Sequence, residues 1–283
     1  MKKYILFLVT ALFFLSACEE ISPTVTGSMA GGGGGGTDPV EDQKRQVIIE
    51  EFTGVRCVQC PAGAAFIRDL LTLHGNQLIA VSIHAGDFTT PYPESQYDFR
   101  TDEGNQLLSY LNEPFGFPSA SVNRKLFPGQ FDLQLGQGDW AGYIASEMEV
   151  APKVRINIEP EFDSGSRELT LDVTLYVDEA ITEPDVRLSI MVTENDIKDL
   201  QITPASSTPQ ADYSHKHVLR DMLTSYDGDP ITESLSAGVE IKKSFTYTVS
   251  GDWKEENCEI VAIVSLAGAS KEVLQAHQVH LVE

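Results

Sequence analysis

The chain has 283 residues, of which 42% are hydrophobic, and its 20 basic residues stand against 42 acidic ones. This length and apolar content are sufficient for two packed domains. The formal net charge of −22 argues against nucleic acid as a partner, because a surface that binds phosphates must present Lys and Arg. The composition therefore indicates an acidic, folded protein.

The first residues have the pattern of a targeting segment. Lys2 and Lys3 form a basic start, and Tyr4–Leu15 is an apolar run too short to cross a membrane after processing. Leu15-Ser16-Ala17-Cys18 follows and resembles the bacterial lipobox. The resemblance implies a signal peptide over residues 1–17 and lipidation of Cys18. The lipid would anchor the protein to a membrane. The alternative is an ordinary signal peptide with an incidental cysteine.

Residues 18–45 have the composition of a flexible tether. Six consecutive glycines, Gly31–Gly36, lie among Ser, Thr, Pro and acidic residues. Such a stretch cannot bury a core, and it lacks the lysine and helix that follow a phosphate-binding glycine loop. We expect it to hold a folded body away from the membrane.

A strand, a turn and a helix are predicted over residues 47–75. Val47-Ile48-Ile49 begins an apolar run typical of a buried strand, and Thr53-Gly54 turns the chain. Apolar residues at helical spacing follow and end at a glycine. Cys57 and Cys60 stand at the start of this helix, and their C-x-x-C spacing brings both sulfurs within disulfide reach. This order of elements is typical of a thiol–disulfide redox site.

The chemistry of such a site gives the two cysteines different roles. A helix N-terminus favours a thiolate because of its free N–H groups and dipole, and Arg56 beside Cys57 acts in the same direction. Cys57 is therefore the expected nucleophile and Cys60 the resolving thiol. The alternatives are a permanent structural disulfide and one half of a zinc site, although the sequence has no second C-x-x-C.

Residues 50–60, EEFTGVRCVQC, resemble the active site of thioredoxin-fold proteins. Those proteins carry a buried acid six residues before the first cysteine, and Glu51 has this offset from Cys57. The resemblance implies that Glu51 exchanges a proton with the buried thiol. Arg56 replaces the usual Trp, and Val58-Gln59 replaces the usual Gly-Pro. These departures leave the redox potential and the set of partners open.

A second motif of the same fold lies downstream. Gly116-Phe117-Pro118-Ser119 is similar to the thioredoxin cis-proline loop, which packs against the disulfide. The resemblance implies that Pro118 belongs to the catalytic group. It also implies that Phe117 and Arg56 line the substrate cleft.

Further patterns complete the first predicted domain, residues 46–151. The apolar run Leu78–His84 predicts a second buried strand and a βαβ unit with parallel pairing. The polar stretch that follows, Ala85–Gly104, is expected to be an inserted loop. The remaining predictions are a helix at Asn105–Leu111, strands at Ser119–Asn123 and Lys125–Phe127, and a helix from the cap Asp139 to about Glu149.

From residue 152 the pattern changes to alternating polar and apolar residues. Runs that begin at Val154, Glu168, Val186, Val239, Glu259 and Val273 predict strands. Ile197–Leu223 is less regular and is expected to be a long connection with one short helix or strand. The predicted fold class is therefore α/β plus all-β, with a thioredoxin-like domain followed by a C-terminal antiparallel β-sandwich at residues 152–283.

Three other residues attract attention by their chemistry. His215 and His217 would share one face of a strand, where Asp212 or Asp221 could join them around a metal. Two histidines without a firm third ligand are more often hydrogen-bonded or solvent-facing, so we predict no metal and no cofactor. Cys258 is left without a partner, and we expect a buried inert thiol, with intermolecular pairing as the alternative.

The whole arrangement resembles the "outer membrane protein twenty-eight"-related lipoproteins of the Bacteroidetes. The residues that carry the resemblance are the lipobox, EEFTGVRCVQCP, GFPSASVNR and SHKHVLRD. It implies a cell-envelope lipoprotein of the outer membrane. Glu19 and Glu20 resemble acidic export signals of that group, which makes surface exposure one option.

Two functions follow from these observations. The first is thiol–disulfide exchange by a lipid-anchored envelope protein whose partners are protein thiols or disulfides. The second is a non-catalytic binding or scaffold lipoprotein, in which the Cys57–Cys60 disulfide is static. The fold alone does not decide between them.

Overall fold

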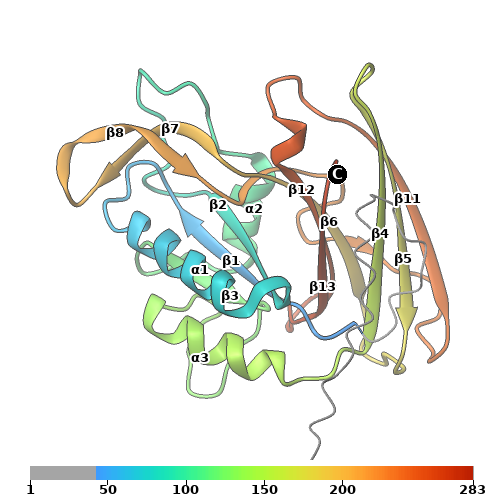
Figure 1. Cartoon of the computed structure of the whole chain (residues 1–283). Helices are drawn as coiled ribbons and strands as arrows, with labels where there is room; N and C mark the ends of the chain where they lie inside the picture. Colours follow the sequence, from blue (N-terminus) through green and yellow to red (C-terminus); the bar gives the residue numbers. More distant parts are fainter. Residues whose placement is uncertain (1–42, 283) are drawn as a thin grey trace, which may run out of the picture. The chain divides into compact units, whose positions relative to one another are not determined.

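The computed structural model describes residues 43–282 (Figure 1). The signal peptide, Cys18 and the glycine tether expected from the sequence lie outside the described residues. Residues 43–282 form a mixed α/β fold with three α-helices and thirteen strands. No helix within this range is long and apolar enough to span a membrane.

The first half is built on a βαβ unit. β1 (Val47–Thr53) and β2 (Leu78–His84) pair in parallel, and α1 (Cys60–His74) with the short 3-10 helix η1 (Gly75–Gln77) connects them. Every residue of both strands is buried, as expected for parallel strands covered on both faces. β3 (Ser119–Val122) pairs antiparallel with the other edge of β1. The predicted βαβ unit is confirmed.

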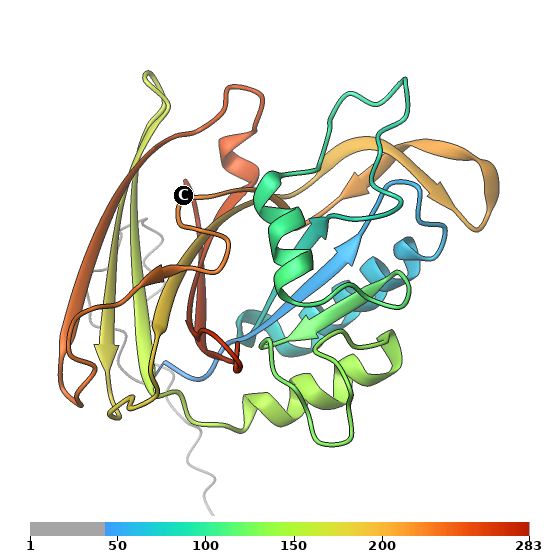
Figure 2. The same cartoon turned by 180° about the vertical axis from the view of Figure 1, so that it is seen from behind.

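Helices cover both faces of these strands. α1 lies in front of the sheet in Figure 1, and α2 (Asp102–Tyr110) lies in front of it in Figure 2, seen from behind. Ile67 of α1 shares a core with Trp140 of α3 (Gln137–Met148). Leu107 of α2 lies in a different core, on the opposite face of the sheet. The two faces of β1 therefore have different environments.

The large sheet continues into the second half of the chain, in the order β13-β12-β6-β9-β2-β1-β3, with β10 paired to β6. β9 joins the halves, because it pairs in parallel with β2 and antiparallel with β6. A separate C-terminal sandwich is therefore not confirmed: strands on both sides of residue 152 belong to one sheet. The strands added by the second half are β6 (Val186–Glu194), β9 (Val218–Met222), β10 (Asp229–Pro230), β12 (Cys258–Leu266, preceded by the 3-10 helix η2, Glu255–Asn257) and β13 (Val273–His280).

A three-stranded sheet packs against one face of this extension. It contains β4 (Val154–Asp163), β5 (Glu168–Val177) and β11 (Glu240–Thr248), in the order β11-β5-β4. Its buried side shares a core with Ile260 of β12, whereas the next residue, Val261, lies in the core on the α2 side. All nine residues of β12 are buried because both of its faces are covered.

Two local predictions are wrong. The stretch expected to be a long connection instead contains β9 and the hairpin of β7 (Ile197–Thr203) and β8 (Ser206–His215). This hairpin lies over the end of β1 that leads into α1 (Figure 1). The second wrong prediction is the strand at Lys125–Phe127, because Asn123 and Arg124 both have a φ of +49° and turn the chain out of the sheet.

Candidate thiol–disulfide site

Cys57 and Cys60 form a disulfide at the start of α1, with their Cα atoms 5.4 Å apart. Both residues are buried, at 4% and 2% exposure. Pro61 stands in the first turn of α1, where a missing N–H costs no helical hydrogen bond. The Cys60 N–H donates to Cys57 Sγ at 3.1 Å. A helix N-terminal donor on this sulfur would favour the thiolate of Cys57 in the reduced pair.

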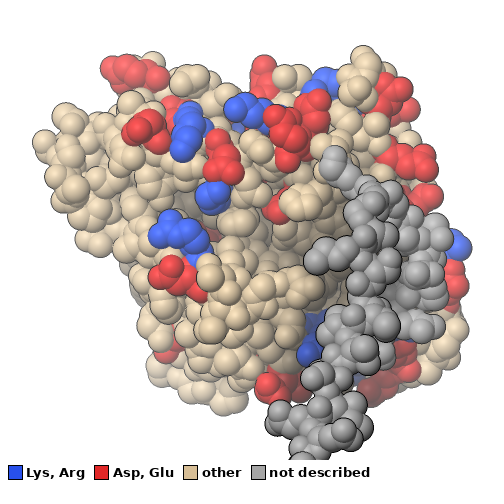
Figure 3. Space-filling model, in the orientation of Figure 1, with Lys and Arg blue, Asp and Glu red and all other residues tan. Residues whose placement is uncertain are grey.

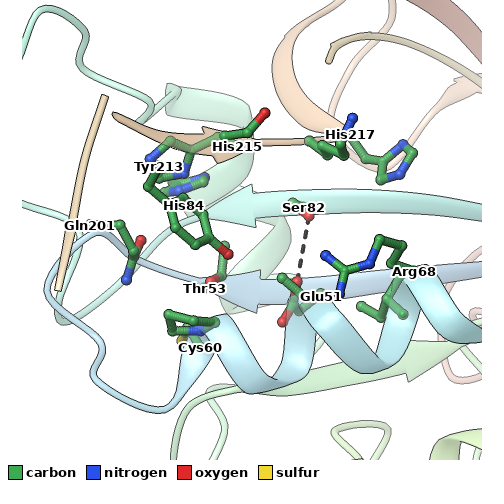
Figure 4. Close-up of a pocket in the computed structure, with 15 residues that line it drawn as sticks. Glu51, Thr53, Cys60, Arg68, Ser82, His84, Gln201, Tyr213, His215 and His217 are labelled. Atoms are coloured by element: carbon green, nitrogen blue, oxygen red, sulfur yellow. Dashed lines mark hydrogen bonds between the residues drawn. The ribbon is translucent and has the colours of Figure 1, made fainter. Parts of the chain in front are cut away.

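Glu51 of β1 is buried behind the disulfide. Its Oε2 accepts a hydrogen bond from Ser82 Oγ at 3.4 Å (Figure 4), and Oε1 has no hydrogen-bond partner among residues 43–282. Burial raises the pKa of Glu51 to about 8, and the Ser82 hydroxyl offsets part of that rise. A carboxyl with this pKa gains or loses a proton near neutral pH, as a thiol does.

Pro118 and Glu51 both lie against Gly63 of α1. The Phe117–Pro118 peptide bond is cis, as the resemblance implied. A methyl group built on Gly63 would stand 2.6 Å from Glu51 Oε1 and 2.8 Å from Pro118 Cγ. Gly63 therefore allows α1 to close on the acid and the proline together. The sequence analysis missed this residue, although a glycine inside a helical pattern is a signal of close packing.

Arg56 is bound to the loop inserted after β2. Its Nε donates to Thr90 O at 2.6 Å, its Nη2 donates to Pro91 O at 2.9 Å, and its guanidinium lies 4.1 Å from the ring centre of Tyr92. These contacts hold the guanidinium of Arg56 against the inserted loop. The support of Arg56 for the Cys57 thiolate remains a prediction.

A cavity of about 450 Å³ opens beside Cys57. Arg56 and Phe117, the two residues expected in a substrate cleft, both line it. Phe88 and Phe115 line it as well, and both are exposed large apolar side chains. Cys57 therefore lines an open cavity whose wall includes three phenylalanine side chains.

A second, smaller cavity of about 120 Å³ lies behind Cys60, between α1 and the β7–β8 hairpin (Figure 4). Glu51 and His84 line it from the sheet, and Tyr213 and His215 line it from β8. Burial lowers the pKa of His84 well below its usual value and that of His215 to about 4, so both imidazoles are neutral at pH 7. The resolving cysteine and the buried acid therefore line the same cavity.

Gln201 of β7 joins the hairpin to the C-x-x-C turn. Its Nε2 donates to Cys57 O at 3.1 Å and to Gly54 O at 3.3 Å, and the neighbouring Ile202 N–H donates to Val55 O at 3.0 Å. The sequence analysis missed Gln201. It lies 144 residues from Cys57, and no local pattern marks it.

Comparison with known families identifies the family of the chain. Residues 105–283, more than half of the sequence, match the family described as outer membrane protein Omp28. The chain belongs to the Omp28 outer membrane protein family. This confirms the predicted family and the outer-membrane location. The matched region includes the β7–β8 hairpin but begins after Cys57 and Cys60.

Solved structures share the fold. HBP35 of Porphyromonas gingivalis superposes with a TM-score of 0.68 at 19% identity, over 84% of this chain and 76% of that one. Protein AGR_C_4864 from Agrobacterium tumefaciens gives 0.53 at 12% identity, over 85% and 96%. A domain of the outer membrane lipoprotein Omp28 from P. gingivalis gives only 0.32 at 18% identity, over 46% and 88%, which supports no argument. A search of curated proteins finds no match. At these identities the likeness shows the fold alone.

The two histidines of the H-x-H motif do not form the expected strand pair. His215 is buried at the end of β8, whereas His217 lies in a turn with a φ of 53° and its Nδ1 is 3.9 Å from Glu259 Oε2. Within residues 43–282, no group of three or more His, Cys, Asp or Glu side chains could hold a metal ion.

Cys258 is buried at the start of β12, as predicted, and its thiol donates to Lys254 O at 3.3 Å. Burial raises its pKa to about 12. Since the thiolate is the reactive form, this cysteine is inert at neutral pH.

Acidic and basic side chains are interspersed on the face of the protein that Figure 3 shows. Among the described residues, the visible face of this protein, whose formal net charge is −22, therefore has no continuous basic patch. The expectation of no nucleic-acid partner remains a prediction.

Proposed function

We propose that this protein is a lipid-anchored envelope protein that exchanges thiols and disulfides through Cys57 and Cys60. The observation that carries the proposal is the setting of the disulfide: a buried acid with a pKa of about 8, Glu51, shares a cavity with Cys60. A permanent structural disulfide gains nothing from a buried carboxyl that titrates near neutral pH. A resolving thiol needs such a proton acceptor.

The exchange would proceed in two steps. The Cys57 thiolate attacks a partner disulfide, forms a Cys57–partner bond and releases one partner thiolate. Glu51, in its ionised form, then takes the proton of the Cys60 thiol and later releases it to solvent, and the Cys60 thiolate attacks Cys57 Sγ. The Cys57–Cys60 disulfide forms, the second partner thiolate leaves, and both partner thiolates take protons from solvent. Two electrons pass from the dithiol to the partner. The reverse steps oxidise a partner dithiol.

The cavity beside Cys57 favours a protein as the partner. Val58, Phe88 and Phe115 are exposed apolar side chains around or near this cavity, and Phe117 lines it from the cis-proline loop. Exposed apolar surface of this kind is typical of a protein-binding site. Phe117 and Arg56 are therefore proposed as substrate-cleft residues, and Pro118 as the residue that orders this edge of the site.

The anchor and the domain division are proposed on the sequence and the fold together. Cys18 would carry the lipid, and residues 18–45 would tether the body to the outer membrane. Residues 46–151 would form the thioredoxin-like domain. The region from 152 onward would act as a sandwich-like domain, in which the three-stranded sheet packs on β6 and β12.

One observation favours the alternative of a non-catalytic binding lipoprotein. The match to the Omp28 family begins at residue 105, so family membership does not depend on the cysteine pair. In that case the disulfide would only stabilise the turn before α1.

Trapping of partners separates the two functions. In the full chain, Cys60→Ser should accumulate mixed disulfides between Cys57 and envelope proteins, because resolution is blocked. The matched control is Cys57→Ser with Cys60→Ser, which should yield none. Recovery of equal amounts of adduct, or of none, from both variants would contradict exchange.

A further inference from the structure

Gln201 holds the C-x-x-C turn from the second half of the chain. The residue is only 3% exposed, and three carbonyl oxygens surround its amide nitrogen: Ile202 O at 3.0 Å, Cys57 O at 3.1 Å and Gly54 O at 3.3 Å. Three acceptors around one end of the amide identify that end as the donor. The side chain is therefore committed to the backbone of the turn.

This commitment affects the Cys60 N–H, which has two acceptors within reach. It lies 3.1 Å from Cys57 Sγ and 3.4 Å from Cys57 O. The carbonyl oxygen already accepts the hydrogen bond of Gln201 at 3.1 Å. Gln201 occupies one of the two lone pairs of this oxygen and so competes with the Cys60 N–H for it. The sulfur is the nearer of the two acceptors of the Cys60 N–H.

Gln201 is itself held in place from both sides. The Ile202 N–H donates to Val55 O at 3.0 Å, inside the same turn. On the other side, the carboxylate of Asp199 accepts the backbone N–H of Gln96 at 3.2 Å and that of Tyr97 at 2.8 Å. Asp199 is 2% exposed, so these bonds are shielded from water. The hairpin thus binds the turn and the inserted loop together.

We propose that Gln201 is a positioning residue of the redox pair: it competes for the Cys57 carbonyl and so favours the Cys60 N–H pointing at the Cys57 sulfur, where this N–H stabilises the thiolate. The inference rests on the proposed exchange function. The β7–β8 hairpin lies in the region matched to the Omp28 family, whereas Cys57 and Cys60 lie before that region. The inference therefore links the matched region to the cysteine pair.

The test compares Gln201→Met with Gln210→Leu in the full, reduced chain. Met keeps the length of the side chain and removes the donor. Gln210 pairs with Gln201 across the hairpin and is exposed, so its substitution is the matched control. The pKa of Cys57 is read from the pH dependence of its alkylation by iodoacetamide, with the labelled peptide identified by mass. We expect Gln201→Met to raise this pKa by about one unit, which lowers the thiolate fraction about tenfold below the pKa. Gln210→Leu should leave it unchanged.

A second variant covers the case in which Gln201→Met unfolds the hairpin. Gln201→Asn keeps an amide donor but is one methylene shorter, and we expect a smaller rise in the same pKa with the thermal unfolding midpoint retained. If the Cys57 pKa is depressed in wild type and is the same in both Gln201 variants, the inference is overturned and the exchange function stays intact. A wild-type pKa at the ordinary thiol value, together with no trapped partners, would overturn the exchange function and the inference with it.

Discussion

Glu50 and Glu51 are neighbours on β1, and both are buried, at 0% and 1% exposure, but they lie on opposite faces of the strand. On one face, Glu50 receives Arg124 Nη2 at 2.6 Å and Nε at 2.8 Å. On the other face, the Ser82 hydroxyl, at 3.4 Å, is the only hydrogen-bond donor to Glu51 among residues 43–282. The comparison teaches that burial alone does not decide what a carboxyl does. Glu50 is bound to a cation and supports the fold, whereas burial of Glu51 raises its pKa to about 8.

The pairing of Glu50 follows from a local feature of the chain. Arg124 is 1% exposed and stands two residues after the end of β3, in the turn with two positive φ angles. That turn directs its guanidinium back across β1, where it forms two parallel bonds with the carboxylate. On the opposite face, Gly63 lies close to Glu51. Arg68 and Lys216 line the same cavity as Glu51, but the Ser82 hydroxyl supplies the one hydrogen bond that Glu51 accepts from residues 43–282.

Breaking the pair should have the largest effect. Arg124→Met leaves the Glu50 carboxylate buried without its partner, and we expect a loss of about 3–5 kcal/mol in the free energy of unfolding. Urea unfolding at pH 7 measures it. The double variant Glu50→Gln with Arg124→Met removes both charges and should recover much of the loss. A loss below about 1 kcal/mol for the single variant would show that the pair behaves like an exposed one.

Glu51→Gln should have the opposite sign. Because the folded-state pKa of about 8 lies above the ordinary 4.5, the folded state keeps a proton that the unfolded state releases, and stability falls as the pH rises between these values. Gln removes this penalty, which is about 3 kcal/mol at pH 7. The variant should therefore be more stable than wild type at pH 7 and less dependent on pH, while resolution of mixed disulfides slows.

The control for Glu51→Gln is the same substitution on the other face. Glu50→Gln leaves Arg124 buried without its carboxylate and should destabilise the protein. Thermal unfolding midpoints of the two variants between pH 5 and pH 8 make the comparison. Destabilisation by both would make Glu51 a structural residue.

Gly63→Ala should have an intermediate effect. The added methyl group would crowd Glu51 Oε1 and Pro118 Cγ, so we expect a loss of about 1–3 kcal/mol in unfolding free energy. Gly142→Ala on α3 is the matched control, because a methyl group there meets no atom within 4 Å. It should raise stability by up to about 1 kcal/mol, as alanine favours a helix. Equal effects of the two substitutions would contradict the close packing at Gly63.

Arg56→Ala should have the smallest effect on the cysteines. The Arg56 guanidinium is engaged by Thr90 O, Pro91 O and the ring of Tyr92, so its removal should raise the pKa of Cys57 by less than about 0.5 unit. Iodoacetamide kinetics measure this shift. A rise of more than one unit would show that the charge of Arg56 acts directly on the sulfur.

The elements around β1 could be predicted because their signals are local. Unbroken apolar runs marked β1 and β2, and the C-x-x-C spacing marked the start of α1. β8 could not be found in this way, since most of its residues are exposed and polar and do not alternate. The single sheet was missed for a related reason: the runs of β6 and β12 were assigned to a sandwich, whereas their almost complete burial indicates strands covered on both faces.

The same distinction applies to the site. Cys57, Cys60, Glu51 and Pro118 were predicted from short motifs, and the structure brings them together around α1. Gln201 was not, because its contacts with the turn form only after β7 crosses the site from the second half of the chain. Arg56 was expected to favour the Cys57 thiolate, which remains a prediction. Its bonds to the carbonyl oxygens of Thr90 and Pro91 were not predicted, because no local pattern places the inserted loop beside it.

A redox titration of the full chain against glutathione, read by thiol-specific mass tagging, tests the central claim most directly. If Cys57 and Cys60 exchange with partners, the pair should titrate within the range of known exchange proteins, about −270 to −120 mV, and Cys57 should be labelled first. A pair that stays oxidised until potentials below about −300 mV would be a structural disulfide and would contradict the exchange function.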